Sequence, residues 1–135
     1  MNHRHSLWMD YASRAAQESY CQRRKVGAVI VKNGTPIAVG WNGTPSGEPN
    51  QCEALDGTTL PHVVHAEDNA LRKLTRGAES GQGATLYVTT APCANCASRI
   101  ADAGIVAVYY SESYSCTGGI EYLERHGVKV EQYEP

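Results

Sequence analysis

The segments His65-Ala66-Glu67 and Pro92-Cys93-Ala94-Asn95-Cys96 decide the predicted fold. The first places a histidine and a glutamate two positions apart at the start of one predicted helix, and the second places a C-x-x-C pair at the start of another. One histidine and two cysteines are ligand types that suit a single zinc ion and leave its fourth position to water. The glutamate is of the type that transfers protons. The two segments therefore predict a metal centre with a proton-transfer group beside it.

The spacing of these side chains suits one tetrahedral ion. Cysteines at positions i and i+3 of a helix lie on one face, and a helix start favours the ionised thiolate. Two thiolates already neutralise the charge of Zn²⁺, so we expect the metal to acidify its water weakly and a carboxylate to take the proton. The sequence thus predicts one catalytic zinc bound by His65, Cys93 and Cys96, with Glu67 as the catalytic proton shuttle.

A C-x-x-C pair also occurs in structural zinc sites and in redox pairs. A structural site requires a fourth protein ligand, and a redox pair does not require the His-x-Glu segment. The combined H-x-E…P-C-x-x-C pattern is typical of zinc-dependent deaminases of nucleobases, which favours a catalytic site. The remaining cysteines, Cys21, Cys52 and Cys116, lack an evident histidine constellation. We expect them to be ordinary buried thiols in a reducing compartment.

The composition is that of a single globular domain over residues 1–135, with 41% hydrophobic residues and a formal net charge of −2. This balance argues against long nucleic acid as a partner, because such proteins usually carry a basic surface. No apolar run approaches the length of a membrane span, and residues 1–20 contain charges and tyrosines where a signal peptide is apolar. We therefore expect a cytoplasmic enzyme with a small substrate and no membrane partner.

Hydrophobic periodicity and turn residues predict an α/β chain. Asn33-Gly34 is a strong hairpin signal, and a predicted helix between the last two strands makes those strands parallel. Strands are expected over residues 26–31, 37–40, 85–89, 105–110 and 128–130, and helices over about 6–19, 65–76, 92–103 and 119–126.

Two further segments are candidates for binding. Arg23-Arg24-Lys25 is the densest positive cluster, and two interpretations remain open: a solvated helix end, or a grip on a phosphate. Residues 42–61 are rich in turn formers and show little periodicity. A loop of this length before the metal motif favours a role in substrate or effector binding.

The sequence resembles the deoxycytidylate (dCMP) deaminases, particularly the short phage-type members, within the zinc-dependent cytidine and nucleotide deaminase superfamily. The zinc motif marks the superfamily, and the Gly-Trp-Asn-Gly-x-Pro loop and a late tyrosine narrow it to this family. The likeness covers nearly the whole chain, in Ser19-x-Cys21-x-Arg23, Val26-Gly27-Ala28-Val29, Gly40-Trp41-Asn42-Gly43-Thr44-Pro45, His65-Ala66-Glu67-x-Asn69-Ala70, Pro92-Cys93-x-x-Cys96, Ala103-Gly104-Ile105 and Tyr110-x-x-x-Tyr114.

The resemblance implies a three-layer cytidine-deaminase-like α/β fold, in which helices flank a five-stranded mixed sheet whose last two strands are parallel. It implies hydrolytic deamination of dCMP to dUMP and ammonia, with a zinc-bound water as nucleophile and dUMP serving as the precursor for dTMP synthesis. Whether 5-substituted dCMP is also accepted stays open. For a phage-encoded member, the compartment is the host cytoplasm.

The resemblance also implies contacts to the nucleotide from Asn42, Ala66 and Tyr114, beside the cationic cluster. It implies a homo-oligomer, commonly a hexamer, that dCTP with Mg²⁺ activates and dTTP inhibits. The effector-binding residues would be Asn42, Gly43, Thr44 and Gly47. Family members often carry adjacent cysteines where this chain has Gln51-Cys52, which leaves a second, structural zinc without an evident ligand set.

Three alternatives share parts of the pattern. A tRNA adenosine deaminase has the same zinc motif and parallel final strands, but a more basic surface and a helical C-terminal extension are expected of it. A free cytidine deaminase more often joins its last strands by a hairpin. A regulatory module that keeps zinc for structure does not need Glu67.

Overall fold

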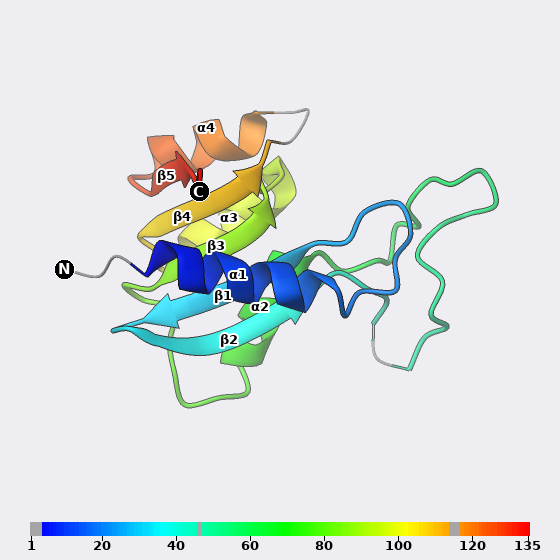
Figure 1. Cartoon of the computed structure of the whole chain (residues 1–135), viewed down its shortest axis with the longest axis horizontal. Helices are drawn as coiled ribbons and strands as arrows, with labels where there is room; N and C mark the ends of the chain where they lie inside the picture. Colours follow the sequence, from blue (N-terminus) through cyan, green and yellow to red (C-terminus); the bar gives the residue numbers. More distant parts are fainter. Residues whose placement is uncertain (1–3, 46, 114–116) are drawn as a thin grey trace.

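Five strands form one mixed sheet in the order β2-β1-β3-β4-β5 (Figure 1). The structure is a computed structural model and describes residues 4–45, 47–113 and 117–135. β1 (Gly27–Lys32) pairs antiparallel with β2 (Thr35–Trp41) and β3 (Thr85–Thr90), whereas β4 (Ala107–Glu112) pairs in parallel with β3 and with β5 (Lys129–Gln132). The predicted five-stranded mixed sheet with parallel final strands is confirmed.

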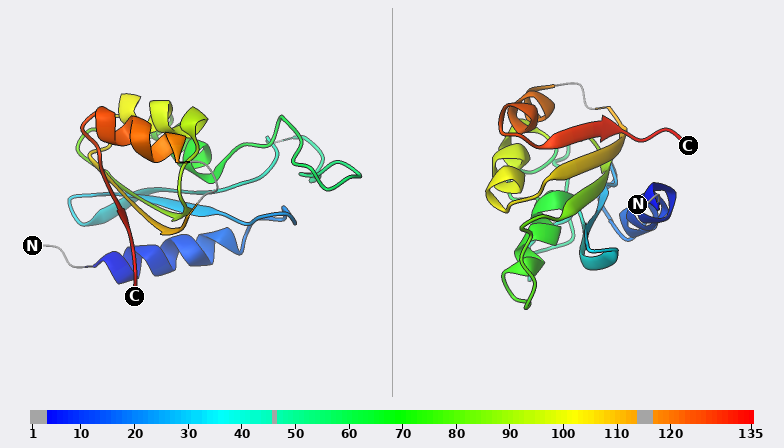
Figure 2. Two further views of the ribbon diagram at one scale, coloured as in Figure 1. Left: turned by 90° about the horizontal axis from the view of Figure 1, so that it is seen from above. Right: turned by 90° about the vertical axis from the view of Figure 1, so that its left-hand side faces the viewer.

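Helices cover both faces of this sheet (Figure 2). α1 (His5–Ala16) lies on one face, and α2 (Ala66–Leu74), α3 (Ala94–Asp102) and α4 (Gly118–Arg125) lie on the other. α3 connects β3 to β4 and α4 connects β4 to β5, and helical crossovers of this kind join parallel strands. The loop between β2 and α2 extends from the same end of the molecule as the segment between α1 and β1 (Figure 1).

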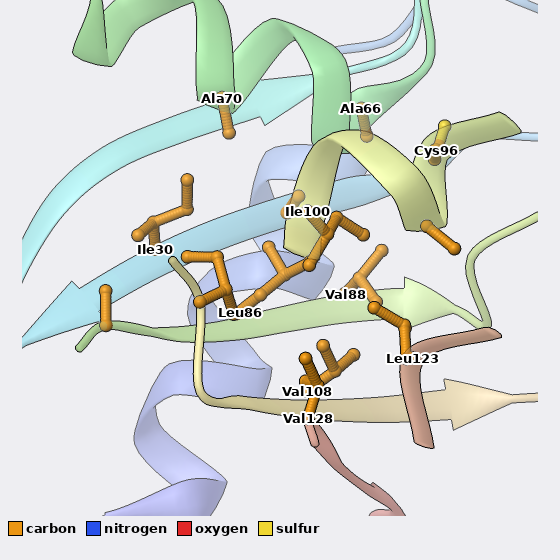
Figure 3. Close-up of a cluster of buried hydrophobic side chains, with 14 of the residues drawn as sticks. Ile30, Ala66, Ala70, Leu86, Val88, Cys96, Ile100, Val108, Leu123 and Val128 are labelled. Carbon is orange, nitrogen blue, oxygen red and sulfur yellow. The ribbon is translucent and has the colours of Figure 1, made fainter. Parts of the chain in front are cut away.

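Two hydrophobic cores lie on the two faces of the sheet. Successive strand residues point to opposite faces, so β1 supplies Ala28 and Ile30 to one core and Val29 and Val31 to the other. The larger core lies under α2, α3 and α4 and contains the zinc-ligand candidate Cys96 (Figure 3). One candidate ligand is therefore anchored in the best-packed part of the molecule.

Glycines let two helices rest directly on the sheet. A Cβ atom at Gly27 would lie 1.9 Å from the carbonyl oxygen of Ala12 in α1, and one at Gly40 would lie 2.5 Å from the carbonyl oxygen of Ala66 in α2. Any side chain at Gly40 would therefore push away the first turn of α2, which carries Glu67. The sequence requirement for glycine here fixes the position of the candidate catalytic helix.

The predicted elements are present, with shifted ends. Asn33 and Gly34 have positive φ angles of 53° and 74°, which confirms the hairpin turn between β1 and β2. α1 ends at Ala16 instead of near residue 19, and β4 begins at Ala107 instead of near residue 105. Among the residues that the structure describes, no helix has the length and apolar character needed to cross a membrane.

Candidate active site

The first turns of α2 and α3 build the site. His65 is the N-cap residue of α2 and Cys93 is the N-cap residue of α3, each with extended backbone angles, and neither side chain caps its helix. N-cap side chains normally accept a hydrogen bond from their own helix. Here the two side chains face each other instead, across the space between the helix starts. The prediction that both cysteines lie in the first turn of the helix is therefore corrected for Cys93, which lies one position before α3 begins, as its N-cap residue.

The three candidate ligands fit one metal ion. The Nδ1 atom of His65 lies 3.2 Å from the Sγ atom of Cys96 and 3.6 Å from that of Cys93. All three ligand atoms lie within 4.8 Å of one another. A tetrahedral zinc ion with ordinary Zn–N and Zn–S bonds separates its ligand atoms by about 3.6–3.8 Å. The geometry and the donor types thus agree with the predicted zinc site.

Hydrogen bonding prepares these ligands for a cation. The pKa of Cys93 is lowered to about 3, chiefly because the thiol of Cys96 and the ring of His65 hydrogen-bond to its thiolate. The pKa of Cys96 is raised because its thiol donates that hydrogen bond to Cys93. The pair therefore holds one proton without a metal, and binding of a metal that needs both thiolates releases it.

Glu67 lies beside the ligands and is almost completely buried, with 4% of its surface exposed. Burial raises its pKa from the ordinary value of 4.5 to about 7, against the opposing effects of a backbone hydrogen bond and the charge of His65. A carboxyl group with this pKa can take up and release a proton near neutral pH, as a general acid–base group must. The environment of Glu67 suits the predicted proton shuttle.

A cavity of about 310 Å³ opens over the ligands. Glu67 and the ligands His65 and Cys93 line it from the helix starts, and the segments around residues 21–26 and 53–63 line it from the other side. The pyrimidine and sugar of a nucleotide can enter a cavity of this size. Its other lining residues are Cys21, Arg23, Arg24, Val26, Asn42, Glu53, Thr59, Val63, Ala66, Thr90 and Ala91.

The three residues of the cationic cluster, Arg23, Arg24 and Lys25, do not all line this cavity. Arg23 and Arg24 line it, whereas the ammonium group of Lys25 donates a hydrogen bond to the carbonyl oxygen of Ser19. The structure thus brings two of the three predicted phosphate-binding side chains to the cavity and engages the third with the backbone.

Asn42 fixes the backbone of this cluster. Its Nδ2 group donates to the carbonyl oxygen of Arg24 at 2.8 Å, and its Oδ1 atom accepts from the amide of Val26 at 2.9 Å. Asn42 also lines the cavity, as does the fully buried Ala66. The third residue predicted to contact the nucleotide, Tyr114, lies outside the described residues.

Of the predicted effector residues, Asn42 lines the cavity, and Gly43 and Thr44 follow it directly in the loop. Gly43 exchanges two backbone hydrogen bonds with Val64, of 3.1 and 2.8 Å, which joins the loop to the residue before His65. The amide of Thr44 donates to the hydroxyl oxygen of Tyr20 at 3.0 Å. Gly47 is exposed and has a positive φ of 90°. Within the described part of the chain, none of Gly43, Thr44 and Gly47 lines the cavity.

The prediction that Cys21 and Cys52 are free buried thiols is wrong. The two form a disulfide with a Cα–Cα distance of 5.2 Å. They are 31 positions apart, and only the return of the loop across the cavity brings them together. Sequence spacing carries no signal for that contact. The third cysteine of the group, Cys116, lies outside the described residues.

Sequence reasoning also missed Glu53. One of its carboxylate oxygens accepts hydrogen bonds from the backbone amides of Gln22 and Arg23, both at 3.0 Å. Together with the adjacent disulfide, this contact holds the loop against the arginine segment. In the sequence, Glu53 is an acidic residue next to Cys52, and this local pattern does not indicate its role.

Comparison with known proteins places the chain in a family. Residues 2–112 match the model of the cytidine and deoxycytidylate deaminase zinc-binding region. The deoxycytidylate deaminase of Enterobacteria phage T4 is 32% identical to this chain over an alignment of 168 positions, gaps included. The alignment covers 93% of this chain and 87% of the T4 protein. The chain belongs to the deoxycytidylate deaminase family.

Two further members of the family show how far the likeness extends. The dCMP deaminase of cyanophage S-TIM5, solved in complex with dCMP and dUMP, superposes with a TM-score of 0.95 and 47% identity, covering 98% of this chain and 99% of the cyanophage chain. The deoxycytidylate deaminase of Saccharomyces cerevisiae is 38% identical over 138 residues. That match covers 95% of this chain but 44% of the yeast protein, so this chain spans less than half the length of that relative.

Proposed function

We propose that the protein catalyses the zinc-dependent hydrolytic deamination of dCMP to dUMP and ammonia. The observation that carries the proposal is the meeting of a buried Glu67 with His65 and Cys93 at one cavity, with the ligand atom of Cys96 within 4.8 Å of those of His65 and Cys93. Membership of the family supports the reaction, and the similarity to the S-TIM5 enzyme, which was solved with dCMP and dUMP, supports the substrate.

Proton transfer falls to Glu67 in this reaction. His65, Cys93 and Cys96 would hold a zinc ion, which would supply a polarised water molecule as the nucleophile. Glu67 accepts a proton from the attacking water, since its pKa of about 7 allows exchange near neutral pH. It gives this proton to the ring nitrogen N3, then takes the remaining proton from the hydroxyl group now on C4 and passes it to the amino group, so that the C4–N bond breaks, ammonia leaves and the C4 carbonyl forms. Its burial keeps these protons from exchanging with bulk water.

The substrate in this proposal is a monophosphate. Arg23 and Arg24 line the same cavity as the candidate metal ligands, and Asn42 holds the backbone between these arginines and β1. Hydrogen bonds from guanidinium groups to phosphate are charge-assisted and often bidentate. We propose that one or both arginines bind the 5′-phosphate, with Asn42 and Tyr114 completing the sugar–phosphate site.

The proposal extends to regulation and assembly. A homo-hexamer supplying dUMP for dTMP synthesis would respond to dCTP with Mg²⁺ as activator and to dTTP as inhibitor. The two hydrogen bonds between Gly43 and Val64 support a path from the loop to the metal ligand at residue 65. An effector changes activity only if it binds one arrangement of this loop better than another.

Calorimetry of dCTP and dTTP tests this regulation. A Cβ atom at Gly43 would lie 3.3 Å from the hydroxyl oxygen of Tyr20, so a Gly43→Val variant should weaken effector binding in particular. By linkage, bound substrate should tighten dCTP binding by the factor with which dCTP tightens substrate binding. Binding of neither nucleotide outside the active site would exclude the regulatory part of the proposal.

Two alternative deaminases fit this chain less well. The formal net charge of −2 does not supply the basic surface expected of a tRNA adenosine deaminase. The parallel pairing of β4 and β5 differs from the hairpin that more often joins the last strands of free cytidine deaminases.

The deciding experiment is a substrate panel with ammonia release as the measurement. It compares dCMP, 5-substituted dCMP, CMP, dCTP, deoxycytidine and an adenosine-containing RNA stem-loop. The proposal requires the highest kcat/KM for dCMP or its 5-substituted form. Preference for deoxycytidine or for the stem-loop would replace it by one of the two alternatives.

A further inference from the structure

An ion pair joins the two helices that carry the metal ligands. Asp68 follows Glu67 on α2, and Arg99 lies three positions after Cys96 on α3. The Nε group of Arg99 donates to Oδ1 of Asp68 at 2.6 Å, and its Nη2 group donates to Oδ2 at 2.8 Å. Both carboxylate oxygens are thus engaged by one planar guanidinium, which fixes its orientation as well as its position.

The pair is better shielded than an ordinary surface ion pair. The side chain of Asp68 is 14% exposed and that of Arg99 is 52% exposed. The acidic partners of the other ion pairs in the described residues, Glu18, Glu79 and Glu131, are 49%, 58% and 53% exposed. Removal of water from the Asp68 carboxylate strengthens its hold on the guanidinium, because the local dielectric is lower.

The same guanidinium reaches a metal ligand. The Nη2 group of Arg99 lies 3.9 Å from the Sγ atom of Cys96, within reach of an N–H···S hydrogen bond. An Nη2 group carries two hydrogens, so one can go to Asp68 while the other goes to the sulfur. Cys96 is fully buried in the core, and Arg99 therefore brings a positive charge to the innermost ligand.

We propose that Asp68 and Arg99 form a positioning pair for the metal centre, in which Asp68 holds the guanidinium of Arg99 against the thiolate of Cys96. The inference rests on the proposed zinc-dependent function. Hydrogen bonds to a ligand from side chains that do not themselves contact the metal tune the metal that it binds. A donor on the sulfur withdraws electron density from it, so the zinc keeps more of its positive charge. This offsets the neutralising effect of two thiolates and polarises the reacting water more strongly.

A purely structural clamp between α2 and α3 predicts different results. Such a clamp would lower stability when either partner is changed, but it would leave the electronic state of the bound sulfur unchanged. The readout must therefore report on the metal–sulfur bond itself. Replacement of zinc by Co²⁺ supplies one, because the sulfur-to-cobalt charge-transfer absorption moves to lower energy as the thiolate becomes more electron-rich.

The experiment compares the Co²⁺-loaded parent with Arg99→Ala, Arg99→Lys, Asp68→Asn and the double variant Asp68→Asn/Arg99→Ala. The exposed Arg72 of α2 supplies a matched control, Arg72→Ala. We expect the absorption to move to lower energy in Arg99→Ala, less in Arg99→Lys and Asp68→Asn, and not at all in the control. Because Asp68 acts through Arg99, the double variant should match Arg99→Ala. With zinc, kcat for dCMP should fall about tenfold in Arg99→Ala, with KM changed less than about twofold.

Two outcomes would overturn these proposals, and they differ. An unchanged absorption in Arg99→Ala, or in Arg99→Lys if the alanine variant does not fold, would remove the positioning role and leave the proposed deaminase function standing. Absence of any sulfur-to-cobalt absorption in the parent would remove the metal centre, and with it the proposed function.

Discussion

Cys21 is covalently joined to Cys52, so the segment after α1 is tied to the loop that precedes the candidate metal ligand His65. Cys21 itself lines the cavity. Glu53, the residue after Cys52, accepts hydrogen bonds from the backbone amides of Gln22 and Arg23 in the arginine segment. One side of the candidate nucleotide site is thus held together by a bond that depends on the redox state of its surroundings, whereas the opposite side is built on two helices.

A Cys52→Ser variant should lose stability and substrate affinity. Closing a loop with a separation of 31 residues stabilises a protein by about 4 kcal/mol in the chain-entropy description. Urea unfolding under non-reducing conditions should show a loss of this order. KM for dCMP should rise with little change in kcat, since the disulfide holds the arginine segment and not Glu67. Mass spectrometry showing two free thiols at Cys21 and Cys52 in the oxidised parent would contradict the basis of this expectation.

Glu67→Gln should keep the fold and the metal and lose most of the activity. A single general acid–base group typically contributes ~10²–10⁴-fold, and one group serves several proton transfers here, so kcat should fall by the upper end of this range or more. Steady-state kinetics with dCMP and metal analysis of the same sample provide the check. If Glu67→Gln turned over dCMP within a few-fold of the rate of the parent, Glu67 would not be the group that transfers protons in the reaction.

The pH dependence of stability should report the burial of Glu67. In the folded protein without metal its pKa is raised from 4.5 to about 7, so the stability associated with its protonated form is fully present below pH 4.5 and is lost as the pH rises through 7. Complete ionisation costs roughly 3 kcal/mol, from the shift between the two pKa values. Chelator-treated Glu67→Gln should therefore gain about this much stability relative to the parent between pH 4.5 and pH 8. Urea unfolding of both proteins at these two pH values measures it, and an equal change of stability in both would show that Glu67 ionises with its ordinary pKa in the folded protein.

Cys93→Ala and Cys96→Ala should each abolish both metal binding and activity. Each variant leaves a single thiolate and a histidine, which is too few ligands for a tight tetrahedral site. Metal content by mass spectrometry and ammonia release from dCMP test this together, with circular dichroism as the control for folding. Full activity in a variant verified to be free of metal would refute a metal-dependent reaction.

Replacement of Arg23 or Arg24 by glutamine should affect dCMP and spare deoxycytidine. A charge-assisted hydrogen bond contributes about 1.5–3 kcal/mol, so KM for dCMP should rise about 10–100-fold for the arginine that binds the phosphate. Lys25→Gln is the matched control, because that side chain bonds to the carbonyl of Ser19. An equal loss with dCMP and deoxycytidine would indicate damage to the fold instead of a lost phosphate contact.

Local patterns predicted the sheet and the metal ligands because short-range chemistry determines both. Asn33-Gly34 requires the positive φ angles that make the hairpin, and the helix before β5 requires the parallel pairing of β4 and β5. The candidate zinc ligands come from two segments whose own spacing indicates a metal site, and the structure brings their ligand atoms within 4.8 Å of one another. The sequence alone was therefore sufficient to predict the sheet and to name the residues that meet at the candidate site.

The periphery of the site depends on contacts between distant residues, which single-sequence reasoning does not supply. Cys21 and Cys52 meet only because an irregular loop folds back, and the interpretation of both as free thiols failed for that reason. Asp68 and Arg99 are also 31 positions apart, and each alone is an unremarkable charge on a helix. The cationic cluster shows the same limit, since it lies in an irregular segment beyond the end of α1 and only the fold separates Lys25 from its neighbours.

The close approach at Gly40 has a consequence for how enzymes of this shape diverge. At Gly40 the backbone of α2 rests on β2 without a side chain between them, so any larger residue at this position would displace the helix that carries Glu67. The loop over residues 42–63 is attached by one disulfide and a few hydrogen bonds, and its tip is exposed. Variation accumulates where the fold permits it. Laboratory evolution toward new nucleotides would therefore begin with a library in this loop, and the chemical step would be inherited unchanged.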